Sequence, residues 1–123
     1  LTHREGHTPR LPKRSPAKLE PLPDPEFNPE PASAARGAHL FNANCMFCHG
    51  VAAVSGGFAP DLRASPIPRS TEAFDGIVHD GGLVPNGMPQ FKEFSDQDRQ
   101  DIRQYIRTEG DKFTKSMRAK QTQ

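Results

Sequence analysis

The protein has 123 residues, a net charge of +1, a hydrophobic fraction of 33% and 13 prolines. This length suits one domain with extensions, the charge balance gives no indication of a nucleic-acid partner, and no segment approaches the roughly 20 consecutive apolar residues of a membrane span. The hydrophobic fraction is low for a compact domain of this length. We therefore expect that part of the chain lies outside the core and that a non-protein group completes the core.

Residues 1–31 are predicted to form an extended, Pro-rich arm or linker. Eight of the 13 prolines lie here, and proline lacks the backbone donor that a helix or a sheet needs. The arm has a basic half that ends at Lys18 and an acidic half that begins at Glu20. We expect Leu22 and Phe27 to dock on the following domain and the basic half to reach a neighbouring domain or subunit. The alternative is a linker without a fixed position.

Residues 32–110 have the composition of a helical domain. The Ala-rich segment from residue 32 predicts a helix that runs into Cys45, with Ser33 as its N-cap. Residues 50–69 are rich in Gly, Pro, Ser and Ala, which predicts a long loop. Loops of this length are uncommon unless they serve a function, and wrapping a large flat cofactor would be such a function.

A second helix is predicted over residues 72–79. Ser70 or Thr71 can cap its start, and the glycine pair at residues 81–82 is a typical helix stop. Residues 83–94 are again predicted to be a loop.

The third helix is expected to begin at Ser95. Ser95 and Asp98 resemble a capping box, with Asp in place of the usual Glu or Gln, and apolar residues follow at helical spacing. We expect this helix to end near Gly110 and residues 111–123 to form a basic, solvated tail. Since no segment shows the alternation of a strand, the sequence predicts an all-α domain with long loops.

The segment Cys45-Met-Phe-Cys48-His49 is the C-x-x-C-H signature of covalent haem attachment. Two thiols at this spacing can add to the two vinyl groups of one porphyrin, and the next residue can then reach the iron with its imidazole. Two cysteines are too few for a closed structural zinc site. A thioredoxin-like thiol pair would need a preceding strand, whereas this sequence predicts a helix there. We therefore expect one covalent haem c, with His49 as an iron ligand.

Met88 is the preferred candidate for the second iron ligand. It lies between Gly87, which lets the backbone approach the ring closely, and Pro89, which stiffens the chain. A thioether ligand raises the haem potential, which suits electron transfer. His79 and Met117 are the alternatives. His79 is expected near a helix end at the surface or the haem rim, and Met117 lies in the predicted polar tail.

Two residues between the haem motif and the second helix are predicted to support the cofactor. A ligating histidine usually donates its other ring N–H to a carbonyl or carboxylate, and Pro60 is a suitable source of this carbonyl for His49. The anionic haem propionates need donors, for which Arg63 is the first candidate and Arg69 the next. The alternatives are a stiffened loop at Pro60 and a solvated Arg63.

Taken together, residues 33–109 resemble a class I cytochrome c domain. Gly37 and Phe41 before the haem motif, with Tyr105 in the last helix, resemble the contact at which the first and last helices of that family cross. The sequence resembles in particular the cytochrome domain of pyrroloquinoline-quinone-dependent quinohaemoprotein alcohol dehydrogenases. The stretches that carry this resemblance are residues 45–57, 60–63, 74–78, 87–91 and 95–98.

The resemblance implies a small fold of three to five helices around one covalent haem. It further implies that electrons arrive from a reduced quinone cofactor in a dehydrogenase domain or subunit and leave to a soluble carrier or a respiratory acceptor, in the periplasm. With both axial positions of the iron filled, the chain would have no catalysis of its own. The alternative is a haem protein whose methionine dissociates, so that the iron acts as a peroxidase or gas sensor.

Overall fold

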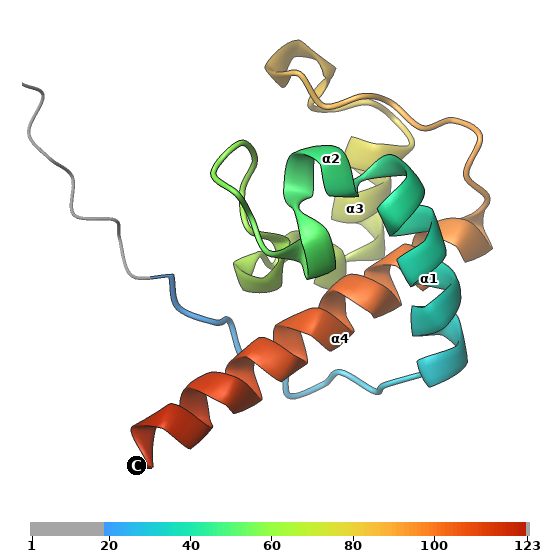
Figure 1. Cartoon of the computed structure of the whole chain (residues 1–123). Coiled ribbons are helices and arrows are strands. Elements are labelled where there is room, and N and C mark those ends of the chain that lie inside the picture. Colours follow the sequence, from blue (N-terminus) through green and yellow to red (C-terminus); the bar gives the residue numbers. More distant parts are fainter. Residues whose placement is uncertain (1–18, 123) are drawn as a thin grey trace, which may run out of the picture.

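The computed structural model describes residues 19–122, which contain helices, turns and loops and no strand. Figure 1 shows the long last helix crossing the first, with the shorter elements gathered on one side of that crossing. This confirms the expected all-α fold. The elements in chain order are α1 (Pro31–Asn44), α2 (Met46–His49), the 3₁₀ turns η1 (Val51–Ala53), η2 (Leu62–Ala64) and η3 (Ile67–Arg69), α3 (Thr71–Val78), the 3₁₀ turn η4 (Val84–Asn86) and α4 (Asp96–Gln121).

Helix α1 begins at Pro31, one turn earlier than the side-chain cap expected from the sequence. Proline is favoured at this position because its fixed φ angle suits a helix and its missing N–H would be unpaired there anyway. Ser33 is therefore not the N-cap. Its side chain is buried and donates a hydrogen bond of 2.6 Å to Asp101 in α4.

The starts of the other two long helices agree with the sequence. The Ser70 side chain accepts from the backbone N–H of Ala73 at the start of α3, and Ser95 and Asp98 form a reciprocal capping box at the start of α4. These caps satisfy backbone donors that a helix leaves unpaired in its first turn.

Helix α4 does not end near Gly110, so that prediction was wrong. It continues to Gln121 over 26 residues, and Thr114, in the segment expected to be solvated, is buried. The physical reason lies in the contact at Gly110. A Cβ atom there would lie 3.2 Å from the carbonyl oxygen of Arg63, so the glycine permits close packing of a continuous helix instead of stopping it.

The crossing of α1 and α4 is the central contact of the fold. A Cβ atom on Gly37 would lie 1.9 Å from the backbone oxygen of Asp101, so only glycine lets the helices approach this closely. The rings of Phe41 and Tyr105 meet beside this point with centroids 5.2 Å apart. The expected crossing is therefore present, with the backbone of Asp101 and Ile102 as the surface that Gly37 meets.

The core of the described residues is small. Its buried members are Phe41, Ala53, Phe74, Val78, Phe94, Ile102 and Ile106. Partly buried side chains, among them Cys45, Met46 and Met88, pack against this cluster. The haem motif and the candidate second ligand therefore contact the same core.

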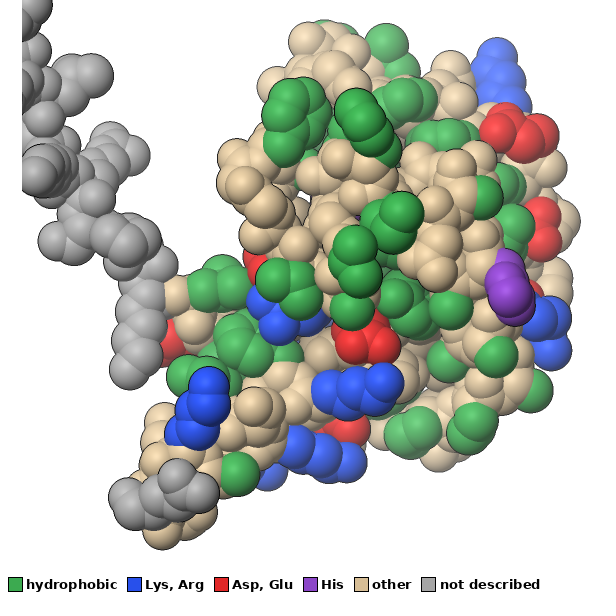
Figure 2. All heavy atoms as spheres, viewed as in Figure 1, with side chains coloured by type: hydrophobic (Ala, Val, Ile, Leu, Met, Phe, Trp, Pro, Cys, Tyr) green, Lys and Arg blue, Asp and Glu red, His purple; other side chains and the backbone are tan. Residues whose placement is uncertain are grey.

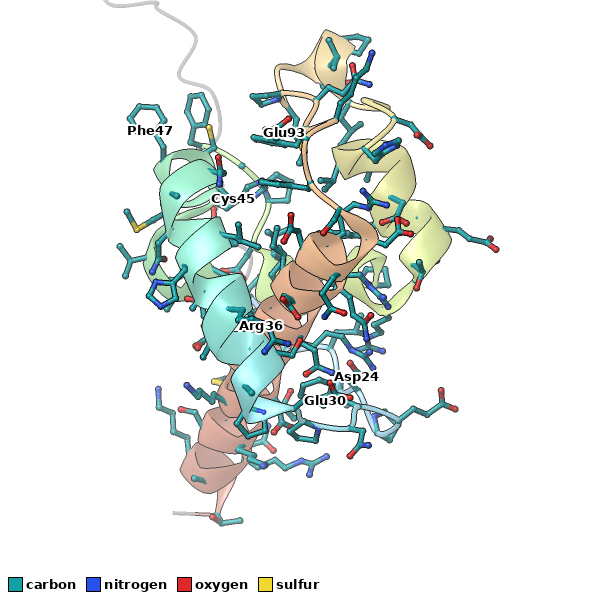
Figure 3. The ribbon with its side chains drawn as sticks, turned by 90° about the vertical axis from the view of Figure 1, so that its right-hand side faces the viewer. Asp24, Glu30, Arg36, Cys45, Phe47 and Glu93 are labelled. Atoms are coloured by element: carbon teal, nitrogen blue, oxygen red, sulfur yellow. The ribbon has the colours of Figure 1, made fainter. Side chains whose placement is uncertain are left out.

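Residues 19–30 of the arm lie along α4 and form a strap. Asp24 pairs with Arg107 at 2.7 Å and lies 3.7 Å from Arg69, while the Phe27 ring lies under the Arg107 guanidinium. Figure 3 shows Asp24 and Glu30 on this strap, close to α4. Phe27 docks as expected. Leu22 contacts the domain through its carbonyl, which accepts from Arg69, and its side chain stays 36% exposed. The basic half of the arm lies outside the described residues.

Candidate haem site

The haem motif is placed by the junction of α1 and α2. Helix α1 ends at Cys45, whose backbone N–H donates to the carbonyl of Phe41. In the short helix α2, the backbone N–H of His49 donates to the carbonyl of Cys45 at 2.9 Å. Both thiols are free and half-buried. His49 is 9% exposed. One helical turn therefore presents two thiols and one buried imidazole from adjacent positions, as covalent haem attachment requires. Figure 3 shows Cys45 at the top of α1, beside the loop that follows α3.

A tight turn after the motif keeps the chain close to His49. Gly50 has φ +89°, and a Cβ atom there would lie 1.8 Å from the carbonyl of Val54. Ala52 and Ala53 also adopt positive φ values of 54° and 61°, which alanine rarely does. The strained turn folds Ala53 into the core, where it is fully buried.

The carbonyl of Pro60 faces the histidine of the motif. The distance from His49 Nδ1 to this oxygen is 3.4 Å, which is slightly long for a hydrogen bond of this kind. The structure therefore brings together the two residues that the sequence paired, and the iron-ligand role of His49 stays a prediction. Ser55 closes the loop between them, because its hydroxyl donates to the carbonyl of Ala59.

Arg63 has partners other than the propionates expected for it. Its guanidinium donates to both carboxylate oxygens of Asp61, at 3.0 and 2.8 Å, and lies 4.2 Å from the centre of the Phe113 ring. The other candidate, Arg69, is engaged with the strap through Leu22 and Asp24. A propionate role for Arg63 stays a prediction.

Met88 lies on the loop that follows α3. Gly87 adopts the left-handed conformation with φ +96°, and the loop is anchored where Phe91 donates its N–H to the carbonyl of Val78 at 2.8 Å. Met88 is partly buried against the same core cluster as Cys45.

The alternative ligands have other surroundings. His79 Nδ1 lies 2.8 Å from the carboxylate of Asp80 near the surface, and the His79 side chain is 45% exposed. Met117 lines a groove beside the strap, together with Pro21 and Pro23. Neither alternative belongs to the cluster that Met88 and Cys45 contact, and Met88 as the second ligand stays a prediction.

The environment of the thiols is unlike that of a redox-active pair. Burial and the neighbouring Cys48 raise the pKa of the Cys45 thiol to about 11, whereas a reactive C-x-x-C thiol has a lowered pKa. Within residues 19–122, no group of three or more His, Cys, Asp and Glu side chains is arranged to hold a metal ion. The raised pKa of Cys45 does not support a thiol-redox function.

Comparison with known proteins agrees with this geometry. Residues 32–106 match the family model described as cytochrome C oxidase, cbb3-type, subunit III. The chain belongs to the class I cytochrome c family. Membership of this family implies a haem c cofactor and electron transfer.

Several relatives of this cytochrome c domain are parts of larger proteins. It is 40% identical over 107 residues to the quinohemoprotein alcohol dehydrogenase ADH-IIG of Pseudomonas putida, a match that covers 86% of this chain and 14% of that protein. It is 40% identical over 82 residues to ADH IIB of the same species, covering 67% and 12%. Cytochrome c550 of Pseudomonas aeruginosa is 37% identical over 68 residues, covering 50% and 45%. The chain therefore spans about one seventh or less of the two dehydrogenases.

The residues of this cytochrome c domain fit a haem. The candidate donors are the imidazole of His49 and the thioether of Met88, which are ligand types of an electron-transfer haem, and two free thiols precede His49 in the motif. Among the described residues, the main core cluster contains only seven buried apolar residues. A porphyrin between His49 and Met88 would supply apolar surface that the chain lacks.

Large apolar side chains are exposed near the haem motif, which the sequence reasoning did not foresee. Phe47 and Phe58 are 96% and 82% exposed, and Val51 is 71% exposed. Figure 2 shows apolar side chains over α2 and the loop beside it. The sequence positions of these two residues indicate their exposure. Phe47 lies inside the haem motif and Phe58 lies in a Gly-rich loop.

Proposed function

We propose that this chain is a single-haem electron-transfer module. Cys45 and Cys48 would hold the haem covalently, and His49 and Met88 would supply the iron ligands. The proposal rests above all on the buried His49, which follows the two thiols and faces the Pro60 carbonyl. When bound, the haem supplies reversible one-electron chemistry. With His49 and Met88 both binding the iron, and the Pro60 carbonyl holding the imidazole in one orientation, the module would carry electrons without a substrate site at the iron.

The electron donor in this proposal is a dehydrogenase domain or subunit that carries pyrroloquinoline quinone, and the acceptor is a respiratory carrier. Support comes from the relatives named quinohemoprotein alcohol dehydrogenases, which match most of this chain. The exposed Phe47 and Phe58 also support a contact with another protein near the haem motif.

The attached cofactor can be tested directly. The holo-protein should keep its haem through acid–acetone extraction, because thioether bonds hold it, and its oxidised spectrum should show the weak band at the red end that marks an iron–methionine bond. Loss of colour on extraction would contradict covalent attachment. Absence of the red band would instead favour an open site and the peroxidase or gas-sensor function.

The proposed location is the periplasm. Covalent attachment to C-x-x-C-H needs both thiols reduced, and the maturation machinery for this family works outside the bacterial cytoplasm. Within residues 19–122, no helix is both long enough and apolar enough to span a membrane. Expression with and without an export signal tests the location. Holo-protein formed in the cytosol without maturation factors would count against it.

A further inference from the structure

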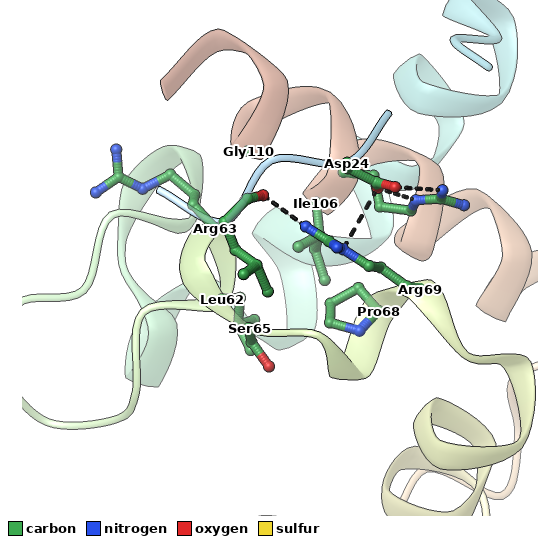
Figure 4. A pocket seen from close by; sticks show the side chains of 10 residues that line it. Asp24, Leu62, Arg63, Ser65, Pro68, Arg69, Ile106 and Gly110 are labelled. Atoms are coloured by element: carbon green, nitrogen blue, oxygen red, sulfur yellow. Dashed lines mark hydrogen bonds and ion pairs between the residues drawn. The ribbon is translucent and has the colours of Figure 1, made fainter. Parts of the chain in front are cut away.

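The second half of α4 packs against the turn that follows Pro60. Gly110 lies so close to the backbone of Arg63 that a Cβ atom would be 3.2 Å from the Arg63 carbonyl. Figure 4 shows Arg63 on η2 beside Gly110 of α4. Three residues further along the helix, Phe113 places its ring 4.2 Å from the Arg63 guanidinium carbon. The C-terminal part of α4, which the sequence did not predict to be helical, thus contacts the loop of the candidate haem site.

Arg63 in turn fixes Asp61. The guanidinium binds both carboxylate oxygens, at 3.0 and 2.8 Å, and the backbone N–H groups of Ser55 and Arg63 donate to the same carboxylate at 3.1 and 3.0 Å. The side chains of Arg63 and Asp61 are only 14% and 6% exposed. Asp61 is therefore held from two sides of the loop, and its carboxylate has little freedom to rotate.

Asp61 and the Pro60 carbonyl belong to one peptide plane. The carbonyl of Pro60 is bonded to the backbone nitrogen of Asp61, and a peptide unit is planar. The ring of Pro60 also restricts its own φ angle. Fixing Asp61 therefore fixes the direction of the Pro60 carbonyl, which lies 3.4 Å from His49 Nδ1.

We propose that Phe113 and Arg63 are positioning residues for His49. They act through Asp61 to hold the Pro60 carbonyl against the imidazole N–H. The proposal rests on the proposed function, in which His49 binds the haem iron. A hydrogen bond to the outer nitrogen makes a ligating imidazole more basic, and a more basic ligand favours the ferric state. The contacts among Phe113, Arg63 and Asp61 should therefore lower the reduction potential of the haem iron.

The test uses the holo-protein and two readouts. Phe113→Ala and Arg63→Gln should each raise the midpoint potential, and each should speed the exchange of the His49 Nδ1 proton with solvent, measured by NMR in the reduced state. Arg63→Lys, which keeps the charge but loses the two-point contact with Asp61, should give the same shifts at smaller size. The matched control is Met117→Ala, which removes a large side chain one turn further along α4, and both readouts should be unchanged.

A second variant keeps the proposal testable if Phe113→Ala fails to fold. Phe113→Leu retains apolar packing but removes the aromatic face, and it should shift both readouts in the same direction. Unchanged potential and unchanged proton exchange in the folded Phe113 and Arg63 variants would overturn the positioning role while leaving haem attachment intact. A wild-type chain that binds no haem would instead overturn the proposed function, so the two failures are distinct.

Discussion

At the scale of single residues, the chemistry of the proposed haem depends most on Met88. We expect Met88→Ala to lower the reduction potential and open the iron to added ligands, because a thioether ligand raises the haem potential and closes the sixth position. Redox titration and binding of imidazole or cyanide measure these two effects. Met117→Ala is the matched control, since Met117 lies beside the strap. An unchanged spectrum and potential in Met88→Ala would move the ligand to His79.

The residues of the site differ in how far the sequence could predict them. Cys45, Cys48 and His49 follow from local spacing alone, and the pairing of His49 with Pro60 follows from the chemistry that a ligating histidine needs. The partners of Arg63 could not be foreseen, because Phe113 is far away in sequence and reaches Arg63 only through the packing of α4 on η2. A sequence shows which donors exist but not which acceptor the fold brings to them.

At the scale of elements, the contact of α1 with α4 depends on the absence of a side chain at Gly37. We expect Gly37→Ala to lower the free energy of unfolding by about 1–3 kcal/mol, the usual cost of overpacking, because the new methyl group would meet the backbone of Asp101 at 1.9 Å. Thermal unfolding measures this loss.

Gly76→Ala is the control. It adds the same methyl in the interior of α3, where nothing lies within 4 Å, and it should be neutral or stabilising by about 0.5–1 kcal/mol. Equal losses in both variants would contradict the crossing argument.

The same helix pair carries a buried carboxylate that makes stability depend on pH. Burial alone would raise the pKa of Asp101, but hydrogen bonds from Arg36, Ser33 and Gln97 outweigh it and hold this pKa below its ordinary value. A carboxyl group with a lowered folded-state pKa adds stability above its unfolded pKa of about 3.9. That stability is lost as the pH falls through the folded-state value.

We therefore expect the free energy of unfolding to fall as the pH drops below about 4. Asp101→Asn should make this fall shallower, and it should lower the stability at neutral pH. Denaturant titrations from pH 2 to 7 measure both effects. Glu93→Gln is the control, because Glu93 is an exposed carboxylate in the loop before α4. If the free energy of unfolding falls equally steeply below pH 4 in the wild type and in Asp101→Asn, the Asp101 network does not cause that loss of stability.

Element boundaries were predictable where local chemistry sets them and not where packing does. Side-chain caps mark the starts of α3 and α4, so the sequence located both. The start of α1 was misplaced because Ser33 has a cap-like composition but serves a tertiary contact with Asp101. The end of α4 was misplaced because Gly110 resembles a helix stop, whereas its function is close packing against Arg63.

At the scale of the whole molecule, the small core predicts that the fold depends on its cofactor. We expect Cys45→Ala combined with Cys48→Ala to abolish covalent haem and to remove most of the cooperative unfolding transition, because seven buried apolar residues leave little surface to replace the porphyrin. Circular dichroism during thermal unfolding measures this. A double variant that stays cooperatively folded without haem would show that the protein core is sufficient.

The basic half of the arm is proposed to contact the electron donor, and the strap anchors the rest of the arm on α4. Since Asp24, Phe27 and Arg107 hold the strap against α4, deletion of residues 1–20 should leave these anchoring contacts and the haem spectrum intact. It should slow electron transfer from the donor and weaken the salt dependence of that rate, because the basic residues removed would steer an acidic partner.

Stopped-flow reduction of wild-type and truncated holo-protein at several ionic strengths measures both effects. The matched control replaces the basic residues up to Lys18 with glutamine at full length, which removes the charge but keeps the chain. If the charge is what matters, this control should resemble the deletion, since long-range attraction between partners depends on charge and is screened by salt. If the deletion leaves the transfer kinetics unchanged, the arm is only a tether. The domain itself must then make the contact with the donor, and the exposed Phe47 and Phe58 are candidates for that contact.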